Sequence, residues 1–228
     1  MNKKILILIC VIVVLLFSFF FIKGVKKERK LITTTTTKPF FDQEIMAKSF
    51  LIGDIKNDKI IYSENENLLT PIASISKLIS AMIVLDNMDM GQYIKVTREH
   101  QKGLESLKFY LHETVSVKDV LYMGLIMSSN DAFSMLAHTY GYSSFIYKMN
   151  MKSDMMGMGN SNFVEPTGLS FENTSTALDL FKLARYIYNN YPLIGEITRK
   201  QSHSFVSLEK IGHTAISTDQ LLGHIPEI

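Results

Sequence analysis

Apolar residues follow several patterns along the chain, and the first predicts a membrane anchor. Residues 5–22 form an apolar run of 18 residues without a charge, which is long enough for a helix that spans a bilayer. Lys3 and Lys4 precede the run, five basic residues follow it by position 30, and no small-residue cleavage site closes it. We therefore predict an uncleaved anchor with basic flanks over residues 1–30.

After the anchor, the pattern predicts a linker and then a folded domain. Residues 31–40 are rich in threonine and poor in large apolar groups, so they are expected to form a linker that does not pack. A folded domain is expected over residues 41–228. Alternating apolar residues near 48–55 and 59–63 predict two strands of a hairpin, with a turn between them.

The middle of the domain is predicted to be helical. Ser116 and Asp119 match a capping box, Pro192 ends the last apolar repeat, and strands are expected again after Ser202. Between residues 86 and 115 the mixed pattern indicates short strands and loops. This is an α/β (α+β) arrangement without the alternation of a doubly wound sheet. The expected helices span residues 71–86, 117–128, 131–139, 144–156 and 176–189.

Composition and charge exclude several classes of function. With 46% hydrophobic and 20% charged residues, the 228-residue chain can bury a core. Residues 1–40 have a net charge of +7, which leaves −5 for the remainder and gives no support for nucleic-acid binding. Cys10 is the single cysteine, so no intrachain disulfide is possible. The six histidines lack the paired spacing of metal ligands, so no metal site is predicted.

A serine and a lysine at the start of the first predicted helix form a candidate nucleophile and base. Ser74 and Lys77 are three residues apart, which places both side chains on one face of a helix. The helix beyond them is apolar nearly all round, so burial should lower the lysine pKa and yield an uncharged amine that can activate the hydroxyl. A second Ser-x-x-Lys begins at Ser207, so the motif alone is not specific.

A second group of polar residues lies where one predicted helix ends and the next begins. Ser128, Ser129 and Asn130 are consecutive at this junction. A hydroxyl and an amide there could relay a proton and hold a substrate peptide group. Serine and asparagine are also frequent helix caps, so Ser129 or Asn130 could serve only to cap the following helix.

Taken together and in this order, the two motifs resemble the active-site serine penicillin-recognising enzymes, whose motif set is Ser-x-x-Lys, Ser-x-Asn and Lys-Thr-Gly. The flanking residues resemble the D-alanyl-D-alanine carboxypeptidases, which are low-molecular-mass penicillin-binding proteins. The similarity covers roughly residues 46–228. The blocks that resemble this family are residues 71–78, 125–132, 149–150, 163–169 and 175–179.

The resemblance implies a serine β-lactamase/transpeptidase-like fold, with an antiparallel sheet flanked by helices and a helical subdomain. It implies acyl transfer from peptidoglycan stem peptides ending in D-Ala-D-Ala, covalent binding of β-lactam antibiotics, and no metal or organic cofactor. Ser74 would be the nucleophile and Lys77 its base, Ser128 would pass a proton to the leaving amine, and Asn130 would hold the substrate amide. The Ser74 N–H would form half of an oxyanion hole.

The third motif of the family departs from this pattern. No Lys-Thr-Gly occurs in the 228 residues, and the resemblance would place it close to the last residue. We therefore expect a C-terminally incomplete catalytic domain, whose activity in this form would be reduced because one oxyanion donor is worth 10² to 10³ in rate. Lys210-Ile211-Gly212 imitates the motif, but it comes too early and lacks the hydroxyl.

Two other functions remain open from the sequence. A class A β-lactamase shares the early motifs, and Glu165 superficially resembles its deacylating glutamate, although no asparagine closes that pattern. A membrane-tethered protein that binds peptidoglycan without catalysis would explain the missing third motif. A Ser-His-Asp hydrolase is not supported, because the chain has no Gly-x-Ser-x-Gly elbow.

Action on peptidoglycan implies a single-pass protein of the cell membrane with its catalytic domain on the extracytoplasmic side. The positive-inside rule points the other way, because more basic residues follow the apolar run than precede it. We give the implied function greater weight than the charge rule.

Overall fold

The computed structural model describes residues 45–100, 108–222 and 224. The predicted anchor and linker lie outside these residues. The helices are η1 (Ala73–Ile75), α2 (Ser76–Asn87), α3 (Val117–Ile126), α4 (Asn130–Tyr140), α5 (Tyr142–Met155), α6 (Ala177–Asn190) and α7 (Pro192–Thr198). The strands are β1 (Phe50–Asp54), β2 (Lys59–Glu64), β3 (Thr70–Pro71), β4 (Tyr93–Lys95), β5 (Thr114–Ser116), β6 (Thr174–Ser175), β7 (Ser202–Val206) and β8 (Gly212–Ile216).

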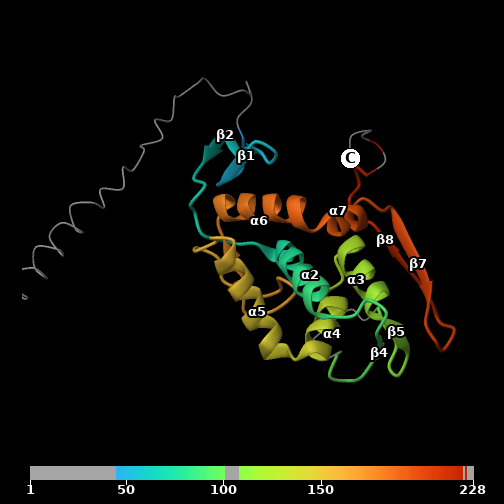
Figure 1. Cartoon of the computed structure of the whole chain (residues 1–228). Helices are drawn as coiled ribbons and strands as arrows, with labels where there is room; N and C mark the ends of the chain where they lie inside the picture. The colour runs from blue at the N-terminus through green and yellow to red at the C-terminus, as the bar shows by residue number, and fades with distance from the viewer. Residues whose placement is uncertain (1–44, 101–107, 223, 225–228) are drawn as a thin grey trace, which may run out of the picture. The chain divides into compact units, whose positions relative to one another are not determined.

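Helix α2 is the centre of the core. It contacts α3, α4 and α5, and Figure 1 shows it between α5 and α3. Its apolar side chains from Ile79 to Val84 are at most 2% exposed, which confirms the prediction of a helix buried on most sides. Burial of each large apolar side chain contributes roughly 1.5–3 kcal/mol, so this packing fixes the position of the first turn of α2.

The helix boundaries follow the local signals in the sequence. The Ser116 hydroxyl accepts a hydrogen bond from the Asp119 N–H at 3.1 Å and donates to its carboxylate at 2.6 Å, so the predicted cap opens α3. Gly141, with φ of 109°, ends α4. Helix α7 was not predicted, because Pro192 was interpreted as the end of a helix. It is instead the first residue of the next helix, where its fixed φ is favourable.

The strands pair into four separate two-stranded antiparallel sheets within the described residues. The expected single sheet is therefore not formed by this part of the chain. The β1–β2 hairpin has the predicted position and packs on α6, as Figure 1 shows. At Gly53 an added Cβ would lie 2.4 Å from the Phe181 ring, which explains the glycine at this contact. The predicted strands after Ser202 are β7 and β8, which contact α3.

No helix within residues 45–100, 108–222 and 224 combines the length and the apolar character that a bilayer-spanning helix needs. The apolar run at residues 5–22 lies outside these ranges.

Candidate active site

Ser74 and Lys77 lie together at the start of the central helix. Ser74 is exposed in the η1 turn, whereas Lys77 is in the first turn of α2 and only 3% exposed. The distance between Lys77 Nζ and Ser74 Oγ is 2.9 Å, which is hydrogen-bond distance. Ala73, the residue before Ser74, has a φ of 46°, a strained conformation of the kind that gathers at functional sites.

The surroundings of Lys77 favour its uncharged form. Burial lowers the pKa of Lys77 to about 8, although the negative charge of Glu165 acts in the opposite direction. At this pKa roughly a tenth of the amine is neutral at pH 7, so a base is available without a large cost. The sequence predicted this lowering from the apolar helix alone.

A loop after α5 covers Lys77 and supplies its second partner. The Lys77 amine donates to the Thr167 carbonyl at 2.7 Å, and one turn further along α2 the Ser80 hydroxyl donates to the Pro166 carbonyl at 2.7 Å. Gly168, with φ of 87°, packs so closely that an added Cβ would lie 1.8 Å from the Ala73 carbonyl oxygen. The loop and the Ser74 turn therefore fix each other.

Glu165 organises this loop from within. One of its carboxylate oxygens accepts from the Thr167 N–H at 2.7 Å and from the Thr167 hydroxyl at 2.6 Å. The other accepts from the Gly168 N–H at 2.5 Å and from the Asn173 side-chain amide at 3.0 Å. Both oxygens are thus saturated by donors near Glu165 in the sequence, unlike a carboxylate poised to activate water.

Asn173 joins the loop to the start of α2. It is fully buried, and its side-chain amide donates to the Ser76 hydroxyl at 3.0 Å, while its side-chain oxygen accepts from the Val164 N–H at 2.8 Å. Its backbone carbonyl accepts from the Ile72 N–H at 3.1 Å. Asn173 therefore braces Ser74 from both sides. Sequence reasoning missed it, because an asparagine in a polar loop gives no signal of burial.

The Ser128–Asn130 segment joins α3 to α4. Ser129 is the N-cap of α4: its hydroxyl accepts from the Ala132 N–H at 3.3 Å and donates to the buried Asp131 carboxylate. The cap alternative is thus correct for Ser129. Ser128 has a left-handed φ of 56°, and Ser128 and Asn130 are half-buried on either side of the cap.

The structure brings Ser74 and Lys77 into contact, and it places Ser128 and Asn130 at the junction of two helices that both pack on α2. The imitation of Lys-Thr-Gly is at the β7–β8 turn, where Lys210 is exposed and has a left-handed φ of 64°. In the part of the chain that the structure describes, no three His, Cys, Asp or Glu side chains gather as metal ligands would.

Comparison with known proteins decides the family. The model of the family described as D-alanyl-D-alanine carboxypeptidase (peptidase S11) matches residues 32–222. The chain belongs to this family. It is 44% identical over 170 residues to a D-alanyl-D-alanine endopeptidase of Escherichia coli K12, covering 71% of this chain and 54% of that protein. It is 31% identical over 149 residues to the D-alanyl-D-alanine carboxypeptidase DacF of Bacillus subtilis 168, covering 61% and 38%.

Solved structures share the fold of this chain. Penicillin-binding protein D2 of Listeria monocytogenes, in its cefotaxime-bound form, has a TM-score of 0.69 and 27% identity, covering 82% of this chain and 78% of that chain. A D-alanyl-D-alanine carboxypeptidase of Mycobacterium tuberculosis H37Rv has a TM-score of 0.74 at 24% identity, covering 81% and 71%. The fold is thus penicillin-binding-protein-like, with helices and small antiparallel sheets. The chain spans about half the length of the endopeptidase that it matches.

Membership of the carboxypeptidase family agrees with the saturated Glu165 and disfavours the class A β-lactamase alternative.

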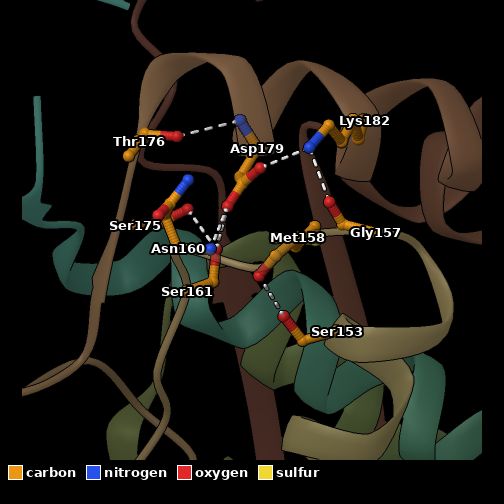
Figure 2. A network of polar contacts seen from close by, with 9 residues as sticks. All are labelled: Ser153, Gly157, Met158, Asn160, Ser161, Ser175, Thr176, Asp179 and Lys182. Carbon is orange, nitrogen blue, oxygen red and sulfur yellow. Dashed lines mark hydrogen bonds and ion pairs between the residues drawn. The ribbon is translucent and has the colours of Figure 1, made fainter. Parts of the chain in front are cut away.

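A second polar network supports the loop that leads into the site (Figure 2). Buried Asp179 accepts from the Asn160 N–H at 2.9 Å and pairs with Lys182 at 2.7 Å. The Ser161 hydroxyl lies 2.7 Å from the Ser175 hydroxyl in β6, which pairs with β3 just before Ser74.

Proposed function

We propose that the protein is a serine-type D-Ala-D-Ala carboxypeptidase that acts on peptidoglycan stem peptides through an acyl-enzyme on Ser74. The observation that supports this best is the 2.9 Å contact between the Ser74 hydroxyl and a buried lysine whose pKa is lowered to about 8. A hydroxyl beside an uncharged amine is an activated nucleophile. The family assignment supplies the substrate class.

In the proposed acylation, Ser74 Oγ attacks the carbonyl carbon of the penultimate D-alanine and its proton passes to Lys77 Nζ. The developing oxyanion accepts a hydrogen bond from the Ser74 N–H. Ser128 relays a proton to the amide nitrogen, the C–N bond breaks, and the terminal D-alanine leaves. Asn130 holds the substrate amide during this step.

In the proposed deacylation, water attacks the ester carbonyl and gives a proton to Lys77. The bond between the carbonyl carbon and Ser74 Oγ then breaks, Lys77 returns the proton to Oγ, and the shortened stem peptide leaves with a free carboxylate. β-Lactams would acylate the same hydroxyl by opening their ring, so they can serve as probes.

Labelling with a fluorescent penicillin tests the proposal. The full-length gene product should form a covalent band, and digestion followed by mass spectrometry should place the adduct on Ser74. Ser74→Ala should abolish the band, whereas Ser207→Ala, which alters the other Ser-x-x-Lys, should retain it. A band that survives Ser74→Ala would refute the proposed nucleophile, and a wild-type protein without any band would favour a non-catalytic peptidoglycan-binding protein.

An endopeptidase is the second candidate, because two relatives at 44% and 36% identity carry that name. The two activities differ in the leaving group, which is a single D-alanine for a carboxypeptidase and a cross-linked peptide for an endopeptidase. Chromatography and mass spectrometry of purified muropeptides decide between them. Release of D-alanine from a pentapeptide monomer supports the first, and cleavage of a cross-linked dimer supports the second.

We further propose that residues 1–30 anchor the protein in the cell membrane, with its catalytic domain on the extracytoplasmic side. The 18-residue apolar run and the peptidoglycan substrate support this. Protease added to cells with a permeabilised outer layer and an intact inner membrane should digest the catalytic domain. Protection of that domain would refute the orientation.

A further inference from the structure

Glu165 holds two consecutive peptide groups by their N–H ends. Its carboxylate accepts from the N–H of Thr167 at 2.7 Å and from the N–H of Gly168 at 2.5 Å. In a trans peptide the carbonyl points away from the N–H of the same group. The two carbonyls are therefore directed away from Glu165 and toward α2.

Each of these carbonyls meets a polar side chain of α2. The Pro166 carbonyl accepts from the Ser80 hydroxyl at 2.7 Å, and the Thr167 carbonyl accepts from the Lys77 amine at 2.7 Å. The peptide group between Thr167 and Gly168 thus connects the Glu165 carboxylate to the proposed base. A negative charge at the N–H end polarises such a group and strengthens its carbonyl as an acceptor.

The Thr167 carbonyl determines how Lys77 meets Ser74. A neutral amine has two N–H donors and one lone pair. When one N–H is fixed on the Thr167 carbonyl, rotation about the last carbon–nitrogen bond is restricted. The lone pair can then face the Ser74 hydroxyl, 2.9 Å away, and accept its proton. Without the carbonyl, the amine would be free to turn its lone pair elsewhere.

We infer that Glu165 is a positioning residue for acylation, which orients the Lys77 amine through the Thr167–Gly168 peptide group. It is not the base that activates water for deacylation. This inference rests on the proposed function, since it assigns a role within the acylation of Ser74. Two features support it: the donors that saturate both carboxylate oxygens, and the close packing of Gly168 against Ala73, which holds the loop against the Ser74 turn.

The groups that act electrostatically on Lys77 make the inference testable by pH. Burial lowers its pKa and the Glu165 charge raises it. Tyr142, at the start of α5, also senses Glu165, because burial and then the Glu165 charge raise its pKa. Tyr142 stays neutral near pH 8. Removal of the Glu165 charge therefore lowers the Lys77 pKa. The acid limb of the pH profile, in which the acylation rate rises as Lys77 loses its proton, then moves to lower pH.

The test measures the rate constants of acylation and deacylation separately, by stopped-flow with a fluorescent penicillin from pH 5 to 10. Glu165→Gln should lower the plateau of the acylation rate 10- to 100-fold, in line with the effect of a misplaced base, and should move the acid limb below pH 8. Deacylation should fall by a comparable factor, because Lys77 also accepts the proton of water in that step. Glu165→Asp keeps the charge but shortens the side chain, so the plateau should fall while the limb stays nearer to that of the wild type.

Glu172→Gln is the matched control, because Glu172 is an exposed glutamate of the same loop. It should leave both rate constants unchanged. Unchanged acylation in Glu165→Gln, or a defect confined to deacylation, would overturn the inference. A uniform loss without a shift of the limb would also overturn it, since a merely structural role predicts that result. If Glu165→Gln does not fold, Glu165→Asp becomes the test. Acylation of Glu165→Asp at the wild-type rate would then overturn the inference.

A second readout does not depend on acylation. Titration of ¹³C-labelled lysine by NMR, with Lys77 assigned by its loss in Lys77→Met, should give a lower Lys77 pKa in Glu165→Gln than in the wild type. If Lys77 of the wild type titrates near pH 8 but no β-lactam or peptide acylates Ser74, the proposed function fails. The link between Glu165 and Lys77 is still decided, because it depends only on whether the Lys77 pKa is lower in Glu165→Gln.

Discussion

Substitution of Gly168 by alanine should disable the site through its backbone. Gly168 has a φ of 87°, a conformation that costs a non-glycine residue roughly 1–2 kcal/mol. The new Cβ would lie 1.8 Å from the Ala73 carbonyl oxygen and 2.9 Å from the Ser74 nitrogen. Atoms of real Cβ groups essentially never come closer than 3.0 Å, so the Ser74 turn or the loop must shift by about 1 Å.

The magnitude follows from that displacement. A shift of about 1 Å in a reacting group typically costs on the order of 10² in rate, which is about 2.7 kcal/mol in the acylation barrier. Overpacking adds roughly 1–3 kcal/mol to the conformational cost, so the free energy of unfolding should fall by about 2–5 kcal/mol. Penicillin acylation by stopped-flow and urea unfolding measure the two quantities.

Gly157→Ala is the matched control. Gly157 also has a left-handed φ, of 70°, but nothing lies within 4 Å of the position of its Cβ. This variant should lose only about 1–2 kcal/mol of stability and should acylate at the wild-type rate. The reasoning would be refuted if Gly168→Ala acylated within twofold of Gly157→Ala.

Three further predictions address charge and support. Acylation should rise with pH through a midpoint near 8, because only neutral Lys77 accepts the proton; a flat profile between pH 6 and 9 would contradict this. Asn173→Ala should lower the free energy of unfolding by roughly 2–4 kcal/mol in urea, since it orphans buried groups on both sides, and an effect below 1 kcal/mol would be inconsistent. Asp179→Asn should lower the free energy of unfolding in urea by roughly 1.5–3 kcal/mol, because the buried carboxylate gives up charge-assisted hydrogen bonds, whereas Lys182 is partly exposed; Glu172→Gln should cost almost nothing.

The sequence predicted elements that local chemistry determines. The apolar spacing of α2, the capping box of α3 and the glycine that ends α4 each depend on residues within one or two turns. The contact of Ser74 with Lys77 also follows from helical spacing, since the η1 turn that holds Ser74 leads directly into the first turn of α2, which holds Lys77.

Features that depend on distant segments were not predictable. The acceptor for Lys77 is a main-chain carbonyl 90 residues away, and a carbonyl is common to every residue type, so it leaves no mark in the sequence. The burial of Asn173 depends on how its loop packs against α2. The pairing of the strands between residues 45 and 222 into small separate sheets was likewise missed, because strand partners depend on the three-dimensional arrangement of the chain.

The main-chain nature of this acceptor has a consequence for how the protein can vary. No substitution at position 167 deletes the carbonyl that accepts from Lys77. A change at 165 or 168 alters the turn that directs this carbonyl toward Lys77. Saturation mutagenesis under selection for activity should therefore tolerate more residue types at 167 than at 165 or 168. Purifying selection would act on the shape of the backbone and leave little trace at the residue whose oxygen makes the contact.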